Sequence, residues 1–190
     1  MGMQAMKPGQ LDTLFPMRSG LRFDLANPTP EMVTVDDIAW ALAHTLRYGG
    51  HSAVPINVAS HSLNVRWVAC SAAPHGEGLC LAALLHDAHE AYLGDVIRPL
   101  KKMLGDTWRD IEHRVDRAIA ERFDIPVELL HDPIIRQADM TVYSWERRDL
   151  VGVRAWDEEP AVVPARACPN ESSEDAFRHL RDELTYLGAR

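Results

Sequence analysis

The sequence has few cysteines, no long apolar run and no excess of basic residues. Its 190 residues contain only three cysteines, Cys70, Cys80 and Cys168. An odd number without metal-ligand spacing predicts reduced thiols in a cytoplasmic protein. The longest purely apolar run covers residues 79–85, far short of the roughly 20 residues of a membrane span. Residues 1–10 also lack the apolar core of a signal peptide, so we expect no membrane partner.

Basic residues are also scarce relative to acidic ones. The chain has 20 Lys and Arg against 28 Asp and Glu, a formal net charge of −8. A binder of nucleic-acid polymers needs a basic surface that displaces counterions, so that class is excluded. A nucleotide is still allowed, because a pocket need not share the sign of the whole protein. We also find no glycine-rich phosphate loop, no Ser-His-Asp order and no nucleophilic cysteine environment.

The periodicity of the apolar residues predicts one all-α domain. Four prolines interrupt residues 1–35, which we expect to be an irregular N-terminal extension, and residues 36–190 are expected to form a helical bundle. Asp36 or Asp37 is the expected first cap, with Gly49 and Gly50 ending that helix. Further helices are expected at 60–73, 78–92 (central and buried), 106–123 and 135–150, with an extended connection over 156–170 and a last helix from 172 to 188.

Polar residues interrupt the apolar faces of three of these helices. His61 shares a face with Val65, the pair His86-Asp87 follows the most apolar segment, and Asp139 lies on an apolar stripe. Each alone fits a satisfied core histidine or an ion pair. Together they are two imidazoles and two carboxylates, which suit one divalent ion: Mn²⁺, Co²⁺, Fe²⁺, Zn²⁺ or Mg²⁺. Four ligands on an ion that prefers six leave positions open for water and substrate, as in a catalytic site.

Two more carboxylates follow close behind. Glu90 comes one helical turn after His86, and Asp95 follows Gly94 where the helix is expected to end. A carboxylate pair beside a metal suits general acid and base catalysis, although a solvated helix end has the same pattern.

These motifs resemble the HD-domain metal-dependent phosphohydrolases, and most closely their 5′-deoxynucleotidase branch with its phage and bacterial relatives. The resemblance spans about half of the chain, from Arg47 to Leu150. It rests on four segments: NVASHS (57–62), ALLHDAHE (83–90), GDVIRPLK (94–101) and QAD (137–139).

The resemblance implies roles residue by residue. His61, His86, Asp87 and Asp139 match the metal ligands, and Glu90 and Asp95 match the residues around the attacking water and leaving group. Arg47 matches the arginine that binds the substrate phosphate, with Tyr48 where the family has tryptophan. Lys101 would add a point charge beside the phosphate. His51 and His89 receive no role.

The expected function is therefore a nucleotide phosphohydrolase acting on a deoxynucleoside 5′-monophosphate. Two alternatives stay open: a dNTP triphosphohydrolase that releases triphosphate, and a nucleotide-sensing regulatory module with little turnover. The apolar C-terminal helix suits either a homo-oligomer interface or a seal over the core.

Overall fold

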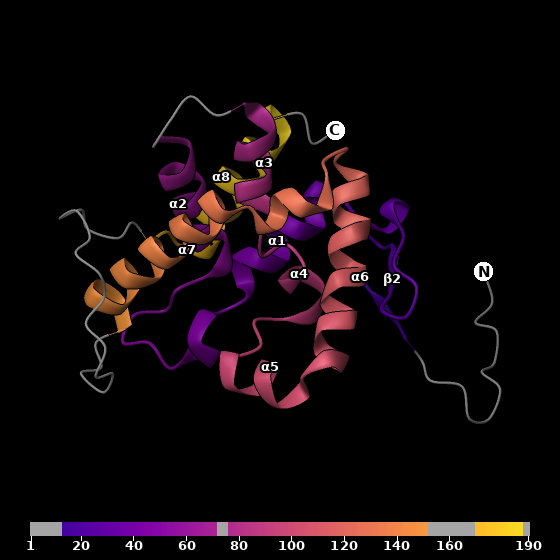
Figure 1. Cartoon of the computed structure of the whole chain (residues 1–190), viewed down its shortest axis with the longest axis horizontal. Coiled ribbons are helices and arrows are strands. Elements are labelled where there is room, and N and C mark those ends of the chain that lie inside the picture. Colours follow the sequence, from indigo (N-terminus) through magenta and orange to yellow (C-terminus); the bar gives the residue numbers. More distant parts are fainter. Residues whose placement is uncertain (1–12, 72–75, 152–169, 188–190) are drawn as a thin grey trace.

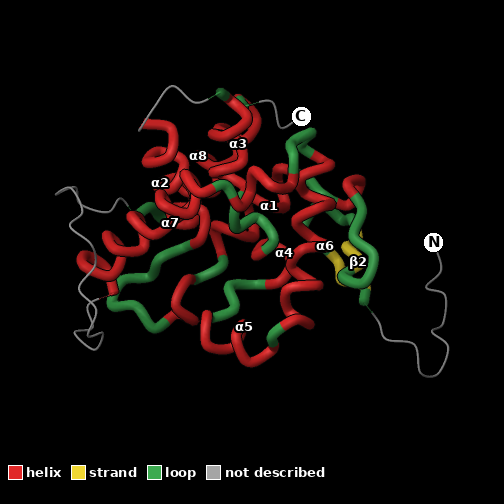
Figure 2. Tube along the Cα trace, in the orientation of Figure 1, coloured by secondary structure: helices red, strands yellow, loops and turns green. Residues whose placement is uncertain are grey.

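Helices dominate the computed structural model, which describes residues 13–71, 76–151 and 170–187 (Figure 1). Figure 2 shows a single small sheet beside the helices of this described part. The expected all-α class is confirmed. In chain order the α-helices are α1 (Val35–His44), α2 (Val58–Ser71), α3 (Glu77–Leu85), α4 (Glu90–Leu93), α5 (Arg98–Leu104), α6 (Asp106–Arg122), α7 (Pro133–Glu146) and α8 (Ser173–Tyr186).

Part of the segment that we expected to be irregular forms a β-hairpin. Strand β1 (Leu14–Pro16) pairs antiparallel with β2 (Arg22–Asp24), which brings Phe15 opposite Phe23. The Phe23 ring is fully buried and stacks on Tyr92 of α4, with ring centroids 3.9 Å apart. Burial of this ring ties the hairpin to the helical core, so the expectation of an irregular head is wrong for these strands. Residues 1–12 lie outside the described part of the chain.

The first helix begins and ends earlier than predicted. Its N-cap is Thr34, whose side-chain oxygen accepts a hydrogen bond from the Asp37 backbone N–H at 3.1 Å. Asp37 therefore lies within the first turn, where a carboxylate favours the helix dipole. The helix ends at His44 because Thr45 is extended, and Leu46 then forms a β-bridge with Asn57. The two glycines belong to a separate turn, η2 (Arg47–Gly50).

The predicted helix over 78–92 is two helices separated by a tight turn. The apolar helix α3 ends at Leu85, and the short α4 begins at Glu90. Between them the backbone N–H groups of Ala88 and Glu90 donate to the carbonyls three residues earlier rather than four. This tightening rotates the side chains of the turn relative to α3. The predicted burial holds for the second half of α3, residues 81–85, in which Leu84 and Leu85 are fully enclosed.

The second half of the bundle follows the predicted periodicity more closely. The long helix α6 lies where it was expected, the short turn η3 (Val127–His131) follows it, and Ser172 caps α8. Helix α7 ends at Glu146, and a π-helical turn, η4 (Arg147–Val151), follows it directly. Helix α5 was not predicted, since it has no buried residue and hence no apolar face toward the core. Most of the predicted extended connection, residues 152–169, lies outside the described residues.

Helix α2 is the hub of the bundle. It packs against α1, α3, α7 and α8, so its side chains face several elements at once. In Figure 1, α7 crosses beside α2, α5 lies at the lower edge, and the N-terminal hairpin appears to the right of α6. None of the described helices is long and apolar enough to cross a membrane.

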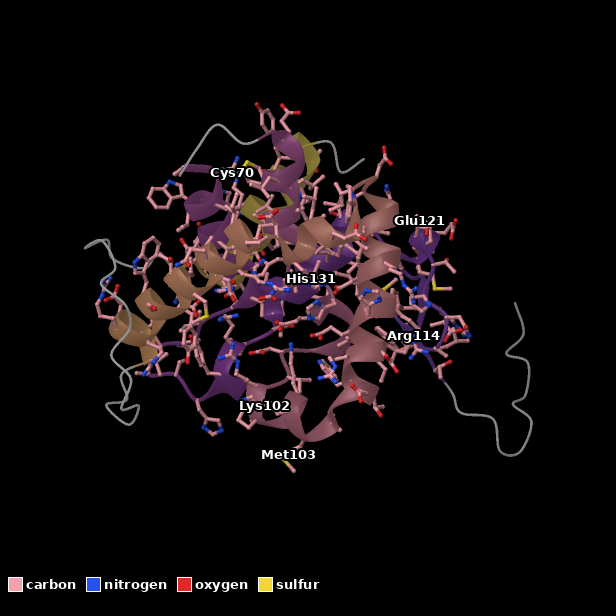
Figure 3. The ribbon with its side chains drawn as sticks, viewed as in Figure 1. Cys70, Lys102, Met103, Arg114, Glu121 and His131 are labelled. Carbon is pink, nitrogen blue, oxygen red and sulfur yellow. A yellow bond between two sulfur atoms is a disulfide. The ribbon has the colours of Figure 1, made fainter. Side chains whose placement is uncertain are left out.

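The prediction of reduced cysteines is wrong for two of the three. Cys70 of α2 and Cys80 of α3 form a disulfide, with their Cα atoms 5.8 Å apart (Figure 3 labels Cys70). The two cysteines lie where neighbouring helices meet beside a short connection, a proximity that counting cysteines does not reveal. Cys168 lies outside the described residues.

Candidate metal centre

Two predicted ligands face each other from helices α2 and α7. His61 is completely buried, and its Nε2 atom lies 3.2 Å from Asp139 Oδ1 and 3.6 Å from Asp87 Oδ2. The third element is the turn after α3, which carries His86 and Asp87. His86 Nε2 lies 3.1 Å from Asp87 Oδ2. The structure thus brings all four predicted metal ligands together.

The histidine rings are oriented to present one nitrogen to this centre. His86 Nδ1 lies 2.9 Å from the Ala83 carbonyl oxygen, which can only accept, so Nδ1 carries the proton and Nε2 is left for the centre. Both His61 Nε2 and His86 Nε2 are buried, and neither makes a hydrogen bond of acceptable geometry with the described residues. Leaving a buried nitrogen unsatisfied costs about 1–3 kcal/mol. A cation at this point would satisfy both nitrogens.

The chemistry of the donor set fits a divalent cation. His61, His86 and Asp87 each offer one ligand atom, and these three atoms lie within 4.8 Å of one another. Such a group could hold a metal ion. Burial opposes ionisation of Asp87, but the charges of His86 and His61 hold its pKa well below the usual range. The carboxylate is therefore ionised at neutral pH. Mixed nitrogen and oxygen ligands suit the first-row divalent metals.

His61 must lose a proton before it can bind such an ion. Burial and the charge of Arg47 lower its pKa, yet the carboxylates of Glu146 and Asp139 outweigh them and raise it to about 9. A metal therefore competes with a proton for this imidazole, which makes metal binding pH-dependent.

Glu90 and Asp95, the predicted proton-transfer pair, lie next to the centre. Glu90 is buried at the start of α4, and Gly94, with φ of 75°, turns the chain so that Asp95 follows at once. Burial, Asp87 and Asp95 raise the pKa of Glu90 to about 8. Burial also raises the pKa of Asp95. A carboxyl group that titrates near neutral pH is suited to donate and accept protons.

A cavity of about 670 Å³ opens beside the candidate ligands. This volume lies within the range of roughly 300–1,000 Å³ that small-molecule sites occupy. The predicted substrate residues Arg47, Tyr48 and Lys101 line it, together with Asp87, Asp95 and Asp139. His51 and Arg98 also line it, whereas Glu90 is not among the lining residues. Apolar side chains complete the lining: Val96, Ile97, Pro99, Met140, Tyr143 and Val151.

Sequence reasoning missed Glu146, the last residue of α7. It is fully buried, and its carboxylate contacts His61 Nδ1 at 2.9 Å, Arg47 Nε at 3.0 Å and the Tyr48 hydroxyl at 2.7 Å. The available signal was its place on the same helical stripe as Asp139. A buried carboxylate on an apolar face needs a partner. Arg47 is a cation, and His61 becomes one when it is protonated.

A second polar cluster, which the sequence also did not reveal, surrounds His89. Its Nδ1 lies 3.1 Å from Asp116 Oδ1 and its Nε2 lies 3.0 Å from Glu112 Oε1, both on α6. Burial opposes the charge, but Asp116 and Glu112 raise the pKa of His89 to about 10. His131, labelled in Figure 3, approaches Asp116 Oδ2 to 3.4 Å.

His89 also belongs to a second group of residues that could hold a metal ion, which consists of Asp87, His89 and Glu90. His89 is held as a cation between two carboxylates, and an imidazolium has no lone pair to offer. The Lys101 ammonium lies 3.6 Å from Glu90 Oε1 and supplies positive charge there. These charges favour the first group as the metal centre and give His89 a structural role.

Comparison with other proteins places the chain among relatives without an assigned activity. No protein-family model matches the sequence. An uncharacterized protein of Rhodobacter capsulatus, RCAP_rcc00048, is 39% identical over 142 residues, covering 72% of each chain. The uncharacterized protein YfdR of Escherichia coli is 33% identical over 132 residues, covering 70% of this chain and 69% of its own. By this similarity the chain belongs to the same protein family as these two proteins.

Proposed function

We propose that the protein is a metal-dependent phosphohydrolase of the HD-domain type that removes phosphate from a nucleotide, with a deoxynucleoside 5′-monophosphate as substrate. One observation carries the proposal. The two imidazoles and two carboxylates predicted as ligands lie together, and the two carboxylates line a cavity that also presents Arg47 and Lys101. Cationic side chains beside a site for a divalent cation suit an anionic substrate such as a phosphate ester.

His61, His86, Asp87 and Asp139 would hold the ion, which polarises phosphoryl oxygens and lowers the pKa of water when bound. Arg47 binds the phosphate through its terminal nitrogens, because its Nε is already engaged by Glu146. Lys101 adds a point charge at the same wall.

Glu90 and Asp95 handle the proton. One carboxylate accepts it from the attacking water as the new P–O bond forms. The other donates a proton to the ester oxygen as the old P–O bond breaks. The pKa of about 8 supports this exchange for Glu90, which can be protonated or ionised near neutral pH. Burial raises the pKa of Asp95 as well.

The apolar part of the cavity supports a nucleoside as the leaving group. Tyr48 and Tyr143 lie roughly parallel, with ring centroids 6.2 Å apart and planes 25° from each other. Tyr143, Ile97 and Met140 line the cavity with Tyr48 and offer apolar surface to a base or sugar.

The test is a panel of nucleoside mono-, di- and triphosphates with products resolved. We expect inorganic phosphate from deoxynucleoside monophosphates, loss of activity in EDTA, and recovery with Mn²⁺ or Co²⁺. Release of intact triphosphate would favour the triphosphohydrolase alternative, and tight binding without turnover would favour a sensor. Asp87→Ala should be inactive, with Asp110→Ala on the exposed face of α6 as its control. Full activity of Asp87→Ala without bound metal would overturn the proposal.

A further inference from the structure

Glu146 divides its carboxylate between the two halves of the proposed site. Oε1 lies 2.9 Å from His61 Nδ1, on the side of the metal ligands. Oε2 accepts hydrogen bonds from Arg47 Nε at 3.0 Å and from the Tyr48 hydroxyl at 2.7 Å, on the side of the phosphate. All three partners come from distant segments of the chain, so a single buried group ties α2 and η2 to the end of α7.

We propose that Glu146 is a positioning residue that sets both the metal-binding nitrogen of His61 and the phosphate-binding face of Arg47. The inference rests on the proposed function, because it assigns Glu146 a role toward that metal and that phosphate. Glu146 acts through His61, Arg47 and Tyr48, and it does not line the cavity.

The hydrogen bond to His61 selects the useful tautomer. An ionised carboxylate only accepts, so His61 Nδ1 must donate, and the remaining nitrogen, Nε2, faces Asp87 and Asp139. Residues that fix a metal-ligating histidine in this way change metal affinity by roughly 10–100-fold when they are removed.

The Oε2 side holds η2 in an uncommon backbone conformation. Tyr48 has φ of 57°, in the left-handed region that side chains other than glycine seldom adopt. Such a residue persists only where its surroundings fix it. The Tyr48 hydroxyl and the Arg47 guanidinium, both anchored on Glu146, supply that restraint. With Nε engaged, the terminal nitrogens of Arg47 remain for the cavity, where NH1 lies 3.7 Å from Asp87 Oδ2.

An amide of the same shape cannot accept hydrogen bonds both from His61 and from Arg47 and Tyr48. In Glu146→Gln, if the amide oxygen faces His61 Nδ1, the amide NH₂ faces the Arg47 and Tyr48 donors. If the amide NH₂ faces His61, the imidazole takes the opposite tautomer and points an N–H at the metal position. Either orientation disrupts one half of the site while the shape of the side chain is kept.

The test measures Mn²⁺ affinity by calorimetry, and kcat and KM by phosphate release, for wild type, Glu146→Gln and Tyr48→Phe. We expect Glu146→Gln to bind Mn²⁺ about 10–100-fold more weakly and to raise KM. Tyr48→Phe removes only one Oε2 contact, so we expect a higher KM with unchanged Mn²⁺ affinity. Tyr48→Phe keeps the inference testable if Glu146→Gln does not fold.

Asp37→Asn is the matched control. Asp37 is another buried carboxylate, bonded to Thr34 and to the Ser19 backbone away from the cavity. It should lower the melting temperature without changing Mn²⁺ affinity or KM. Wild-type Mn²⁺ affinity in Glu146→Gln, or weakened Mn²⁺ binding in Tyr48→Phe, would overturn this inference alone. Wild type that neither binds Mn²⁺ nor hydrolyses nucleotides would overturn the proposed function and this inference with it.

Discussion

His61 Nε2 on α2 lies 3.2 Å from Asp139 Oδ1 on α7, so two residues far apart in sequence meet at one point of the core. The pair is arranged as two ligands of one cation would be. We predict that Asp139→Asn weakens Mn²⁺ binding by more than about 100-fold, beyond the loss caused by residues that only orient ligands. Calorimetry measures this directly, with Asp110→Asn on exposed α6 as the control. Unchanged affinity would remove Asp139 from the ligand set.

Arg47 should not tolerate replacement by lysine. Its Nε donates to Glu146 while its NH1 lies 3.7 Å from Asp87 Oδ2, a fork that an ammonium group cannot reproduce. We expect Arg47→Lys to raise KM about 10–100-fold, the loss of one charge-assisted hydrogen bond. Steady-state phosphate release measures it, with Arg136→Lys on exposed α7 as the control. Equal KM values for wild type and Arg47→Lys would contradict the phosphate-binding role.

Removing the Glu90 carboxylate should slow the reaction without releasing the metal. Glu90→Gln keeps the volume of the buried side chain but cannot exchange a proton. We expect kcat to fall by about 10²–10⁴-fold, the usual contribution of general acid and base catalysis, with Mn²⁺ affinity within a few-fold of wild type. A parallel fall in Mn²⁺ affinity would instead identify Glu90 as a ligand.

The metal-free protein should become less stable as the pH rises from 6.5 to 10. The pKa of Glu90 is about 8 in the folded protein, against 4.5 for an ordinary glutamate. Between these values the folded protein keeps a proton that the unfolded chain has released, so raising the pH favours unfolding. The pKa values of His61 and His89, about 9 and 10, lie above the ordinary 6.5. Their stabilising contribution is complete below pH 6.5 and is lost as the pH passes these values.

Urea unfolding in EDTA at pH 6.5 and 9.5 checks this pH dependence. His89→Gln removes one of the three groups and should flatten the profile, whereas the exposed His113→Gln on α6 should not. Stability that is constant or rises over this interval would show that these groups are not protonated in the folded state.

The sequence alone allowed much of the helical bundle to be predicted, because apolar periodicity reports which face of a helix is buried. It did not reveal α5, whose apolar residues are exposed: Met103, on the outer edge in Figure 3, is 84% exposed. It also did not reveal the break between Leu85 and Glu90, since every residue there is compatible with a continuous helix. The break arises from hydrogen bonds that tighten the turn.

The candidate site was only partly predictable for a related reason. His86, Asp87 and Glu90 are neighbours in sequence, so their spacing could be read directly. Glu146 pairs with His61 and Arg47, which lie 85 and 99 residues away, and no local pattern reports such contacts. Its position on the stripe of Asp139 marked it as a buried acid in need of partners, but only the packing of α7 against α2 shows which partners it has.

The central claim is that His61, His86, Asp87 and Asp139 hold one divalent cation. The most direct measurement is the metal content of the purified protein after equilibration with Mn²⁺ or Co²⁺ and removal of free ion, compared with His86→Ala. We predict close to one ion per chain for wild type and almost none for His86→Ala, with the same helical circular dichroism for both. Wild type without bound ion, or equal metal content in His86→Ala, would contradict the account.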